Sequence, residues 1–436
     1  MFPNLSFLKM FVNKILVLLS VICSFMTSSV ATPPQNFLAS RMNTIKPSPT
    51  LAITGDASKR KKAGEDIIIL AAGEPDFDTP DHIKEAAVDA MNRGLTKYTA
   101  VDGLPDLKKA IQKKLQDENG LSYDVSEIIV GVGGKQVIFN ALLATCEEGD
   151  EVIIPAPYWV SYPDIVKLCG ATPVFVDCPE KDGFKLTPQA LKKALTPKTK
   201  WIILNSPSNP TGAVYTKDEL KALGDVLKNH TCMIMSDDIY EYLTYEGEFY
   251  NLPMTCPDDL KERILVVNGV SKAYAMTGWR IGYGAGPKAL ISAMTMLQSQ
   301  STSNACSIAQ AATITALNAP KHFLSDWKKS FIARRDFCVK AINKIKGLSC
   351  TQAKGAFYLY INCEKLLGAR TPLGSTLQND TDVATYFLNQ CGVAVVPGSA
   401  FGLSPFFRIS YATSMDELQK ALQRIEKAVD ALDFKR

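Results

Sequence analysis

The sequence predicts an α/β protein in which a mostly parallel β-sheet is covered by helices and followed by a smaller α+β domain. Between residues 128 and 267, short apolar runs rich in β-branched residues alternate with helical patterns and turn residues. This alternation is typical of parallel sheets that are buried on both faces. After residue 331, a long helical pattern leads to alternating strands and a final amphipathic helix. The 436 residues, 46% hydrophobic and 21% charged, are sufficient for two domains.

Residues 1–31 have the pattern of a leader. Two lysines precede the apolar run Ile15 to Met26, which is shorter than the ~18 residues of a membrane-spanning helix. Small residues follow at Ser29 to Ala31, as at a signal-peptide cleavage site. The alternative is a mis-assigned start or a non-structural extension, with Met42 as a possible internal start. On either interpretation, the leader does not contribute to the fold.

Residues 32–78 are predicted to be an N-terminal segment that joins the small domain. The prolines of Lys46-Pro47-Ser48-Pro49-Thr50 disfavour a helix and favour an extended segment. A short strand, Ile67 to Leu70, then leads into the turn-rich loop Ala72 to Pro80.

A large domain is predicted over residues 79–328 and a small domain over 329–436. The large domain begins with an amphipathic helix, Asp81 to Asn92, and a loop that contains Tyr98. Its predicted strands are Ile128 to Val130, Val152 to Ile154, Pro173 to Val176, Trp201 to Leu204, Cys232 to Met235 and Ile264 to Val267. Those of the small domain are Ala356 to Ile361, Val393 to Val396 and Phe406 to Ser410, before a helix from Met415 to Leu432.

Charge and composition argue against several classes of function. The net charge is +4 without a long basic block, so nucleic acid is not an expected partner, and no membrane partner is expected. Eleven cysteines without a C-x-x-C pair indicate buried thiols in a reducing compartment. The three histidines, His82, His230 and His322, are not spaced as ligands. We therefore expect neither a metal site nor a serine–histidine hydrolase.

Each predicted parallel strand is followed by a loop of unusual chemistry, at the sheet edge where ligands bind in open α/β folds. Gly131 to Gln136 follows the first strand. It matches neither the dinucleotide-binding nor the P-loop pattern, because Gln136 stands where a glycine or a hydroxyl residue is required. A glycine loop that opens a helix can nevertheless hold a phosphate.

The stretch Asn268 to Gly286 carries the strongest signal. Ser271 and Lys272 follow the buried run that ends at Val267, and Arg280 precedes a glycine-rich segment. A lysine amine becomes a good imine former where nearby cations and low polarity lower its pKa. A planar guanidinium suits the paired oxygens of a phosphate.

Other loops add aromatic, amide and carboxylate groups. These are Pro157-Tyr158-Trp159, the polar segment Asn205 to Gly212, and Ser236 to Glu241 with adjacent aspartates. Trp159 could be a core residue, and the aspartates could cap a helix. Arg408 stands inside an apolar strand, where it could form either a structural salt bridge or a ligand contact.

Together these motifs closely resemble those of the class I pyridoxal-phosphate (PLP) aminotransferases, over residues 36 to 432. The resemblance is to the bacterial aspartate enzymes, in a subgroup that includes aspartate/prephenate enzymes. It implies PLP fold type I and PLP as the cofactor. In such enzymes Lys272 would be the Schiff-base lysine, Asp237 would pair with the pyridinium nitrogen, and Tyr240 and Asn209 would bond the phenolic oxygen.

The resemblance also assigns the remaining site residues. Trp159 would stack on the pyridine ring. The positions matching the cofactor-phosphate contacts are Gly133, Gly134, Lys135, Ser271, Arg280 and, from the partner chain of a homodimer, Tyr98. Arg408 would grip the substrate α-carboxylate, with Gly73, Trp159 and Asn209 also at the substrate. Ser48, Thr50 and Lys135 match residues that contact a distal carboxylate, and Lys46 matches a residue associated with prephenate.

The implied activity is reversible amino transfer from aspartate to 2-oxoglutarate, together with amination of prephenate to arogenate. Amino acids and 2-oxo acids would be the small-molecule partners. The alternatives are another PLP aminotransferase or lyase of this fold, or a non-enzymatic exported protein that retains it. The cysteine usage favours the cytoplasm, and a functional leader would instead favour export or an organelle.

Overall fold

The computed structural model describes residues 9–18, 37–256 and 260–434. It divides into two units, Met1–Asn43 and Thr44–Arg436. In the first unit, residues 9–18 are helical and η1 (Ser40–Asn43) is a short 3-10 helix. The predicted cleavage positions, Ser29 to Ala31, lie outside the described residues. Of the helices described, none combines the length and apolarity needed to cross a membrane.

The second unit contains a seven-stranded sheet in the order β2-β8-β7-β6-β5-β3-β4. β8 is antiparallel to its neighbours β2 and β7, and the other pairs are parallel. The strands are β2 (Ile128–Val132), β3 (Glu151–Ala156), β4 (Thr172–Asp177), β5 (Thr199–Asn205), β6 (Met233–Asp237), β7 (Ile264–Gly269) and β8 (Ile281–Ala285). All six strands predicted for this region are present, which confirms the mostly parallel sheet.

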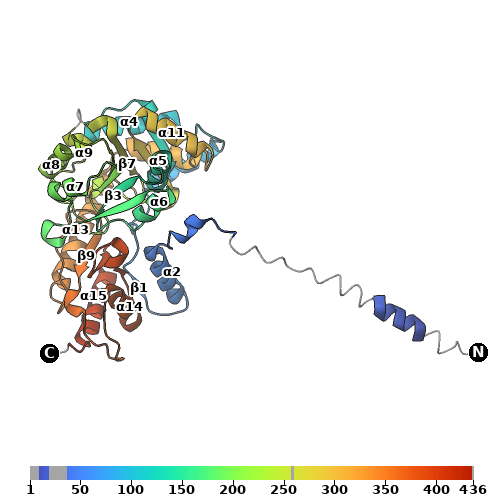
Figure 1. The fold of residues 1–436 in the computed structure, drawn as a ribbon, viewed down its shortest axis with the longest axis vertical. Helices are drawn as coiled ribbons and strands as arrows, with labels where there is room; N and C mark the ends of the chain where they lie inside the picture. The colour runs from blue at the N-terminus through green and yellow to red at the C-terminus, as the bar shows by residue number, and fades with distance from the viewer. Residues whose placement is uncertain (1–8, 19–36, 257–259, 435–436) are drawn as a thin grey trace, which may run out of the picture. The chain divides into compact units, whose positions relative to one another are not determined.

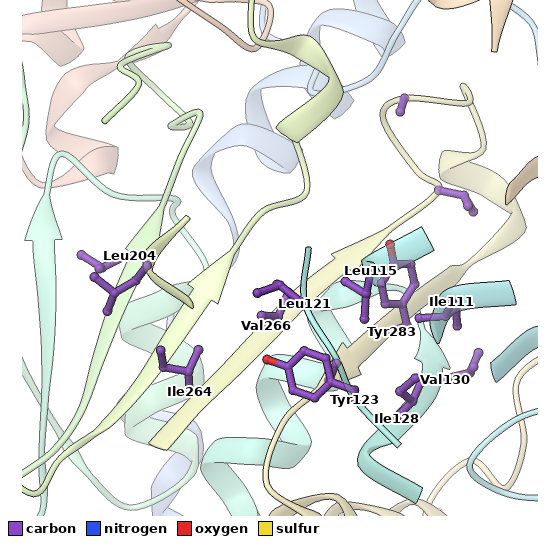
Figure 2. Close-up of a cluster of buried hydrophobic side chains, with 14 of the residues drawn as sticks. Ile111, Leu115, Leu121, Tyr123, Ile128, Val130, Leu204, Ile264, Val266 and Tyr283 are labelled. Carbon is purple, nitrogen blue, oxygen red and sulfur yellow. The ribbon is translucent and has the colours of Figure 1, made fainter. Parts of the chain in front are cut away.

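Side chains that alternate along these strands enter two separate cores. Ile202 and Val266 belong to the first core, while Ile203 and Val267 belong to the second. Figure 2 shows part of the first core, with Tyr283 of β8 close to α4. Helices of the first core are α3 (Asp81–Asn92), α4 (Pro105–Asn119), α7 (Pro188–Ala194), α8 (Lys217–Leu227), α9 (Leu252–Thr255), α12 (Ser307–Asn318) and the first turn of α13 (His322–Ile342). Those of the second are α5 (Gly134–Thr145), α6 (Tyr162–Leu168) and α11 (Lys288–Ser299). The sheet is therefore covered on both faces, as the apolar strand runs predict.

A second group of elements surrounds a smaller antiparallel sheet, β11-β12-β9. Its strands are β9 (Tyr358–Asn362), β11 (Val396–Pro397) and β12 (Phe406–Ser410), and a separate parallel pair joins β1 (Ile68–Ile69) to β10 (Val393–Ala394). The helices here are α2 (Pro49–Lys62), α13 (His322–Ile342), α14 (Asp380–Cys391) and α15 (Met415–Asp430). In Figure 1, α14 and α15 lie beside β9, away from α4, α5 and α11. The β1–β10 pair ties the N-terminal segment to these C-terminal elements.

Three local predictions differ from the structure. The segment around Pro47 is not extended throughout, because α2 begins at Pro49, and proline is tolerated in the first helical turn. The run Val393 to Val396 forms two short strands in different sheets. The long helix that the sequence predicts at the start of the small domain is α13, and it begins at His322, before the predicted domain boundary at residue 328.

Candidate active site

A cavity of about 410 Å³ lies where β5, β6 and β7 end and α5 begins. Elements far apart in the sequence contribute to its wall, including β12 and the first turn of α2. Thirteen of the predicted site residues line it, namely Ser48, Thr50, Gly73, Gly134, Lys135, Trp159, Asn209, Asp237, Tyr240, Ser271, Lys272, Arg280 and Arg408. Gly133 is the residue before the first turn of α5. Lys46 and Tyr98 are exposed and are not part of the wall.

Lys272 projects from the loop that follows β7. Its Nζ donates a hydrogen bond of 2.6 Å to the carbonyl oxygen of Gly73. Burial lowers the pKa of this amine to about 8, the nearby charge of Glu74 opposes the shift, and Arg280 contributes to it. Lys272 therefore exchanges a proton much more readily near neutral pH than an ordinary lysine.

Asp237 is the last residue of β6 and is buried. Its Oδ2 accepts a hydrogen bond of 2.5 Å from the hydroxyl of Tyr162. Burial raises the pKa of the Asp237 carboxyl to about 6, while the Tyr162 hydrogen bond acts in the opposite direction. The carboxylate is thus mostly ionised at neutral pH and is available to pair with a cationic ring nitrogen.

The other end of the cavity gathers groups suited to an anion. α5 begins at Gly134, and its free N–H groups and dipole favour a negative charge. Arg280 lies beside this turn, where its Nη2 donates to the carbonyl oxygen of Val132 at 3.2 Å. A Cβ on Gly133 would lie 2.4 Å from Arg280 Nη2, and the φ of 80° at Gly133 also favours a glycine there. Ser271 adds a hydroxyl to the same wall.

Arg408 lies on β12 and is 1% exposed. Its Nη1 donates to Asn209 Oδ1 at 2.8 Å, and its Nη2 donates to the carbonyl oxygen of Ala71 at 2.8 Å. Among the described residues, no carboxylate pairs with it, and its Nε has no hydrogen-bond partner. The structural salt bridge considered as an alternative is therefore not found in this part of the chain. A buried guanidinium without a counter-charge is suited to receive a carboxylate ligand.

Aromatic rings line the wall between these groups. The hydroxyls of Tyr240 and Tyr358 are 2.8 Å apart, and the Arg408 guanidinium lies 4.4 Å from the centroid of the Tyr358 ring. Trp159 packs edge-on against Tyr162, and Lys135 Nζ lies 4.8 Å from the Trp159 ring. Burial lowers the pKa of Lys135, and the nearby charge of Arg280 adds to this shift. Trp159 is therefore a wall residue of the cavity rather than only a core residue.

Sequence reasoning missed several residues that hold the site together. Asn205 donates to the carbonyl oxygen of Asp237 at 2.9 Å, and its Oδ1 accepts from the Asn209 N–H at 2.9 Å. Tyr162 donates a hydrogen bond to Asp237, and the hydroxyl of Tyr358 shares a hydrogen bond with that of Tyr240. Thr54 of α2 also lines the cavity, and its hydroxyl is buried without a partner among the described residues. The sequence does point to Asn205, because this residue opens the polar segment at the end of β5. The roles of Tyr162, Tyr358 and Thr54 depend on neighbours that are distant in the sequence.

The family model of Aminotransferase class I and II matches residues 65–425. The chain belongs to this family. A relative from Rickettsia bellii, named probable aspartate/prephenate aminotransferase, is 55% identical over 399 residues, which are 91% of this chain and 100% of the relative. The aspartate aminotransferase of Rhizobium meliloti (strain 1021) is 53% identical over 90% of this chain and 96% of its own length.

Solved structures of aspartate aminotransferases share the fold of this aminotransferase. One from Rhizobium meliloti superposes with a TM-score of 0.88 at 53% identity, covering 91% of this chain and 99% of the other. One from Thermus thermophilus with maleate gives a TM-score of 0.85 at 42% identity, covering 90% and 100%. These likenesses confirm fold type I, because each match covers 90% or more of this chain with a TM-score of 0.85 or higher.

Proposed function

We propose that this aminotransferase uses PLP to transfer the amino group of aspartate to 2-oxoglutarate and also converts prephenate to arogenate. The observation that carries the proposal is the buried Arg408, which lacks a counter-charge among the described residues and faces the same cavity as Lys272 and Asp237. A substrate carboxylate would supply the missing charge.

The residues present fit PLP at three points. The start of α5, Ser271 and Arg280 would hold the phosphate, since a helix N-terminus and a guanidinium both favour an anion. Asp237 would hold a proton on the ring nitrogen by opposite charge. Trp159 would cover one face of the ring.

When bound, PLP supplies an electron sink for the charge left on the substrate α-carbon when its proton leaves. The chain itself provides the remaining chemistry. Arg408 would bind the α-carboxylate through two parallel hydrogen bonds and so orient the substrate. The Lys272 amine, with its pKa near 8, would take the α-proton and return a proton to complete the transfer. Tyr240 would donate a hydrogen bond from its hydroxyl to the phenolic oxygen, next to the amide of Asn209.

The proposed substrates are dicarboxylates. Ser48 and Thr50 bring hydroxyls to the cavity wall, and Lys135 brings a cation, so a distal carboxylate would have three partners. The names of the relatives and the maleate in the Thermus structure support the same class of substrate. Lys46 is exposed and lies two residues before Ser48, and we assign it to prephenate only.

A panel of amino donors and oxo acids tests this function. We expect activity with aspartate and glutamate as donors, with oxaloacetate and 2-oxoglutarate as acceptors, and with prephenate as a further acceptor. Lys272→Ala should abolish turnover with all of them. In Lys46→Ala, kcat/KM should fall for prephenate and stay unchanged for oxaloacetate. Equal loss for every substrate, or no prephenate activity in the wild type, would contradict the second activity while leaving the first intact.

Assembly and location complete the proposal. We propose a homodimer in which Tyr98 of each chain reaches the cofactor phosphate of the other. Tyr98 is 90% exposed and lies outside the cavity wall of its own chain, which supports a role in a second chain. We also propose that the enzyme works in the cytoplasm. This is supported by its cysteines, of which the ten in the described residues are all free and mostly buried.

A further inference from the structure

The loop from Thr96 to Leu104, here called the Tyr98 loop, combines an exposed tip with a fixed base. Tyr98 at its tip is 90% exposed, and no described residue pairs with its hydroxyl. Behind the tip, the carbonyl oxygen of Asp102 accepts a hydrogen bond from the Val130 N–H at 2.9 Å. A Cβ on Gly103 would lie 2.6 Å from Val130, so the loop packs closely against β2. The loop therefore presents an aromatic ring from a fixed backbone.

Gln310 of α12 makes the first set of contacts that fix this loop. It is 0% exposed. Its Oε1 accepts from the Leu104 N–H at 2.7 Å, and its Nε2 donates to Thr99 Oγ1 at 3.1 Å and to the carbonyl oxygen of Ala305 at 2.8 Å. Both donors and the acceptor of this amide are in use, and two of the three bonds go to the Tyr98 loop.

Gln298 of α11 makes the second set. It is 1% exposed. Its Nε2 donates to the carbonyl oxygens of Val101 and Val130, at 2.7 and 2.8 Å, and its Oε1 accepts from Asn140 Nδ2 at 3.1 Å. This side chain thus ties the Tyr98 loop to β2, the strand that leads to the start of α5.

The simpler explanation is that both glutamines only satisfy polar groups in a core. Burying an amide is costly unless its hydrogen bonds are made, and a methionine would fill a similar volume without that requirement. Two fully bonded amides from different helices converge on residues 99–104, on either side of Gly103. Such a network specifies one backbone conformation more than it adds stability.

We propose that Gln298 and Gln310 are positioning residues that hold the Tyr98 loop in the conformation that reaches the cofactor phosphate of a second copy of this chain. This inference rests on the proposed homodimer with shared sites. It adds to that proposal that the loop is shaped within each chain before the partner uses it. The two glutamines would act in trans, on the site of the partner, although they lie in the core of their own chain.

The first test follows the loop itself, in cofactor-free protein, by hydrogen–deuterium exchange. In Gln310→Met and Gln298→Met we expect the backbone amides of residues 101–104 to exchange about tenfold faster, because polar groups of the loop lose their buried partners. Gln112→Met is the matched control, since Gln112 makes a similar bond of 2.7 Å to the carbonyl oxygen of Tyr123, away from the loop. Unchanged exchange in the loop would overturn the proposal.

The second test separates action in trans from action within one chain. Gln310→Met chains are combined with Lys272→Ala chains, and hybrid dimers are purified through two different tags. One site of each hybrid contains the Lys272 of the first chain and the native Tyr98 loop of the second. We expect this site to recover the wild-type kcat/KM and cofactor affinity, while the Gln310→Met homodimer binds PLP more weakly. A hybrid of Tyr98→Ala with Lys272→Ala is the reference.

The outcomes of the two hybrids distinguish this inference from the proposed function. If the Tyr98→Ala hybrid recovers and the Gln310→Met hybrid keeps its defect, the shared site stands and the positioning role is wrong. If neither recovers, the shared site fails and this inference fails with it. Should Gln310→Met not fold, Thr99→Val removes one of its bonds from the loop side, and the same recovery is expected in its hybrid with Lys272→Ala.

Discussion

Lys272 and Asp237 are ionisable groups whose pKa values are shifted toward each other. Burial disfavours the charged form of each group, so it lowers the pKa of Lys272 to about 8 and raises that of Asp237 to about 6. Groups with pKa values near the working pH are suited to holding and moving protons. The free-energy cost of burying them should be visible in the stability of the protein.

The first prediction concerns Lys272 and the pH dependence of unfolding. Between pH 8 and the ordinary lysine pKa of 10.5, the unfolded chain keeps a proton that the folded chain has lost. The contribution of Lys272 to the free energy of unfolding therefore rises with pH through this window. Relative to Lys272→Met, cofactor-free wild type should gain up to about 3 kcal/mol in its free energy of unfolding between these limits. Urea unfolding at several pH values measures this gain, and parallel pH curves for the two proteins would contradict it.

The second prediction concerns Tyr162. Its hydroxyl donates to Asp237 and holds the carboxyl pKa below the value that burial alone would give. In Tyr162→Phe the pKa of Asp237 should rise further, so that the carboxylate is lost at a higher pH. We expect the acid limb of PLP binding to move up by roughly one pH unit.

Fluorescence titration of PLP at several pH values measures this limb. Tyr386→Phe is the control, because this buried tyrosine bonds the carbonyl oxygen of Ala428 and is not in the cavity wall. A shift of the same size in both variants would assign the effect to general destabilisation.

At this scale the sequence identifies residues that lie in motifs and misses those defined by distant contacts. Lys272 and Asn209 follow strand ends in recognisable loops, Asp237 is the last residue of a strand, and all three line the cavity. Tyr162 meets Asp237 across 75 positions, and Tyr358 meets Tyr240 across 118. Neither tyrosine has an unusual local sequence, so only the folded chain reveals its role.

Among the secondary-structure elements, β8 shows why a glycine-rich stretch can be a strand. The sequence around Gly282 and Gly284 has few side chains that could show the alternation of a strand, so the pattern predicts no strand there. In the structure, a Cβ on Gly282 would lie 2.2 Å from the Gly134 N atom. β8 therefore needs a glycine at this position so that the first turn of α5 can pack directly on its backbone.

The third prediction follows from this close approach. Gly282→Ala should displace the first turn of α5, lower the free energy of unfolding by about 1–3 kcal/mol and weaken PLP binding. Gly278→Ala is the matched control, because a Cβ there meets no atom within 4 Å. Thermal unfolding and PLP titration measure both effects. Equal affinity in the two variants would show that the start of α5 does not bind the phosphate.

The helices illustrate a second limit of local patterns. Proline disfavours a helix interior but suits a first turn, so the chemistry of Lys46 to Thr50 is compatible with both an extended segment and the start of α2. α13 passes through the predicted boundary at residue 328 because Trp327 packs against both large hydrophobic cores. A continuous helix that serves two cores gives no composition change at the boundary.

For the whole molecule, we propose a large domain over residues 79–328, a small one over 329–436 and a joining segment over 32–78. The two main cores and the β1–β10 pair support this division. α13 would then connect the two domains as one rigid element. The order of strands in the large sheet was not predictable, because each parallel crossover allows several neighbours and only tertiary packing selects one.

The last prediction is that residues 1–31 are dispensable for folding and catalysis. Residues up to Asn43 form a separate unit, the family match begins at residue 65, and the side chains of the helix at residues 9–18 are exposed. A chain beginning at Thr32 should therefore keep the free energy of unfolding, PLP affinity and kcat/KM of the full chain. A chain beginning at Gly64 is the contrasting control, because it also removes Ser48 and Thr50 from the cavity wall and the buried Ala57 from its core. It should lose stability and activity toward dicarboxylates. A Thr32 chain that is insoluble or fails to bind PLP would show instead that the leader takes part in forming the enzyme.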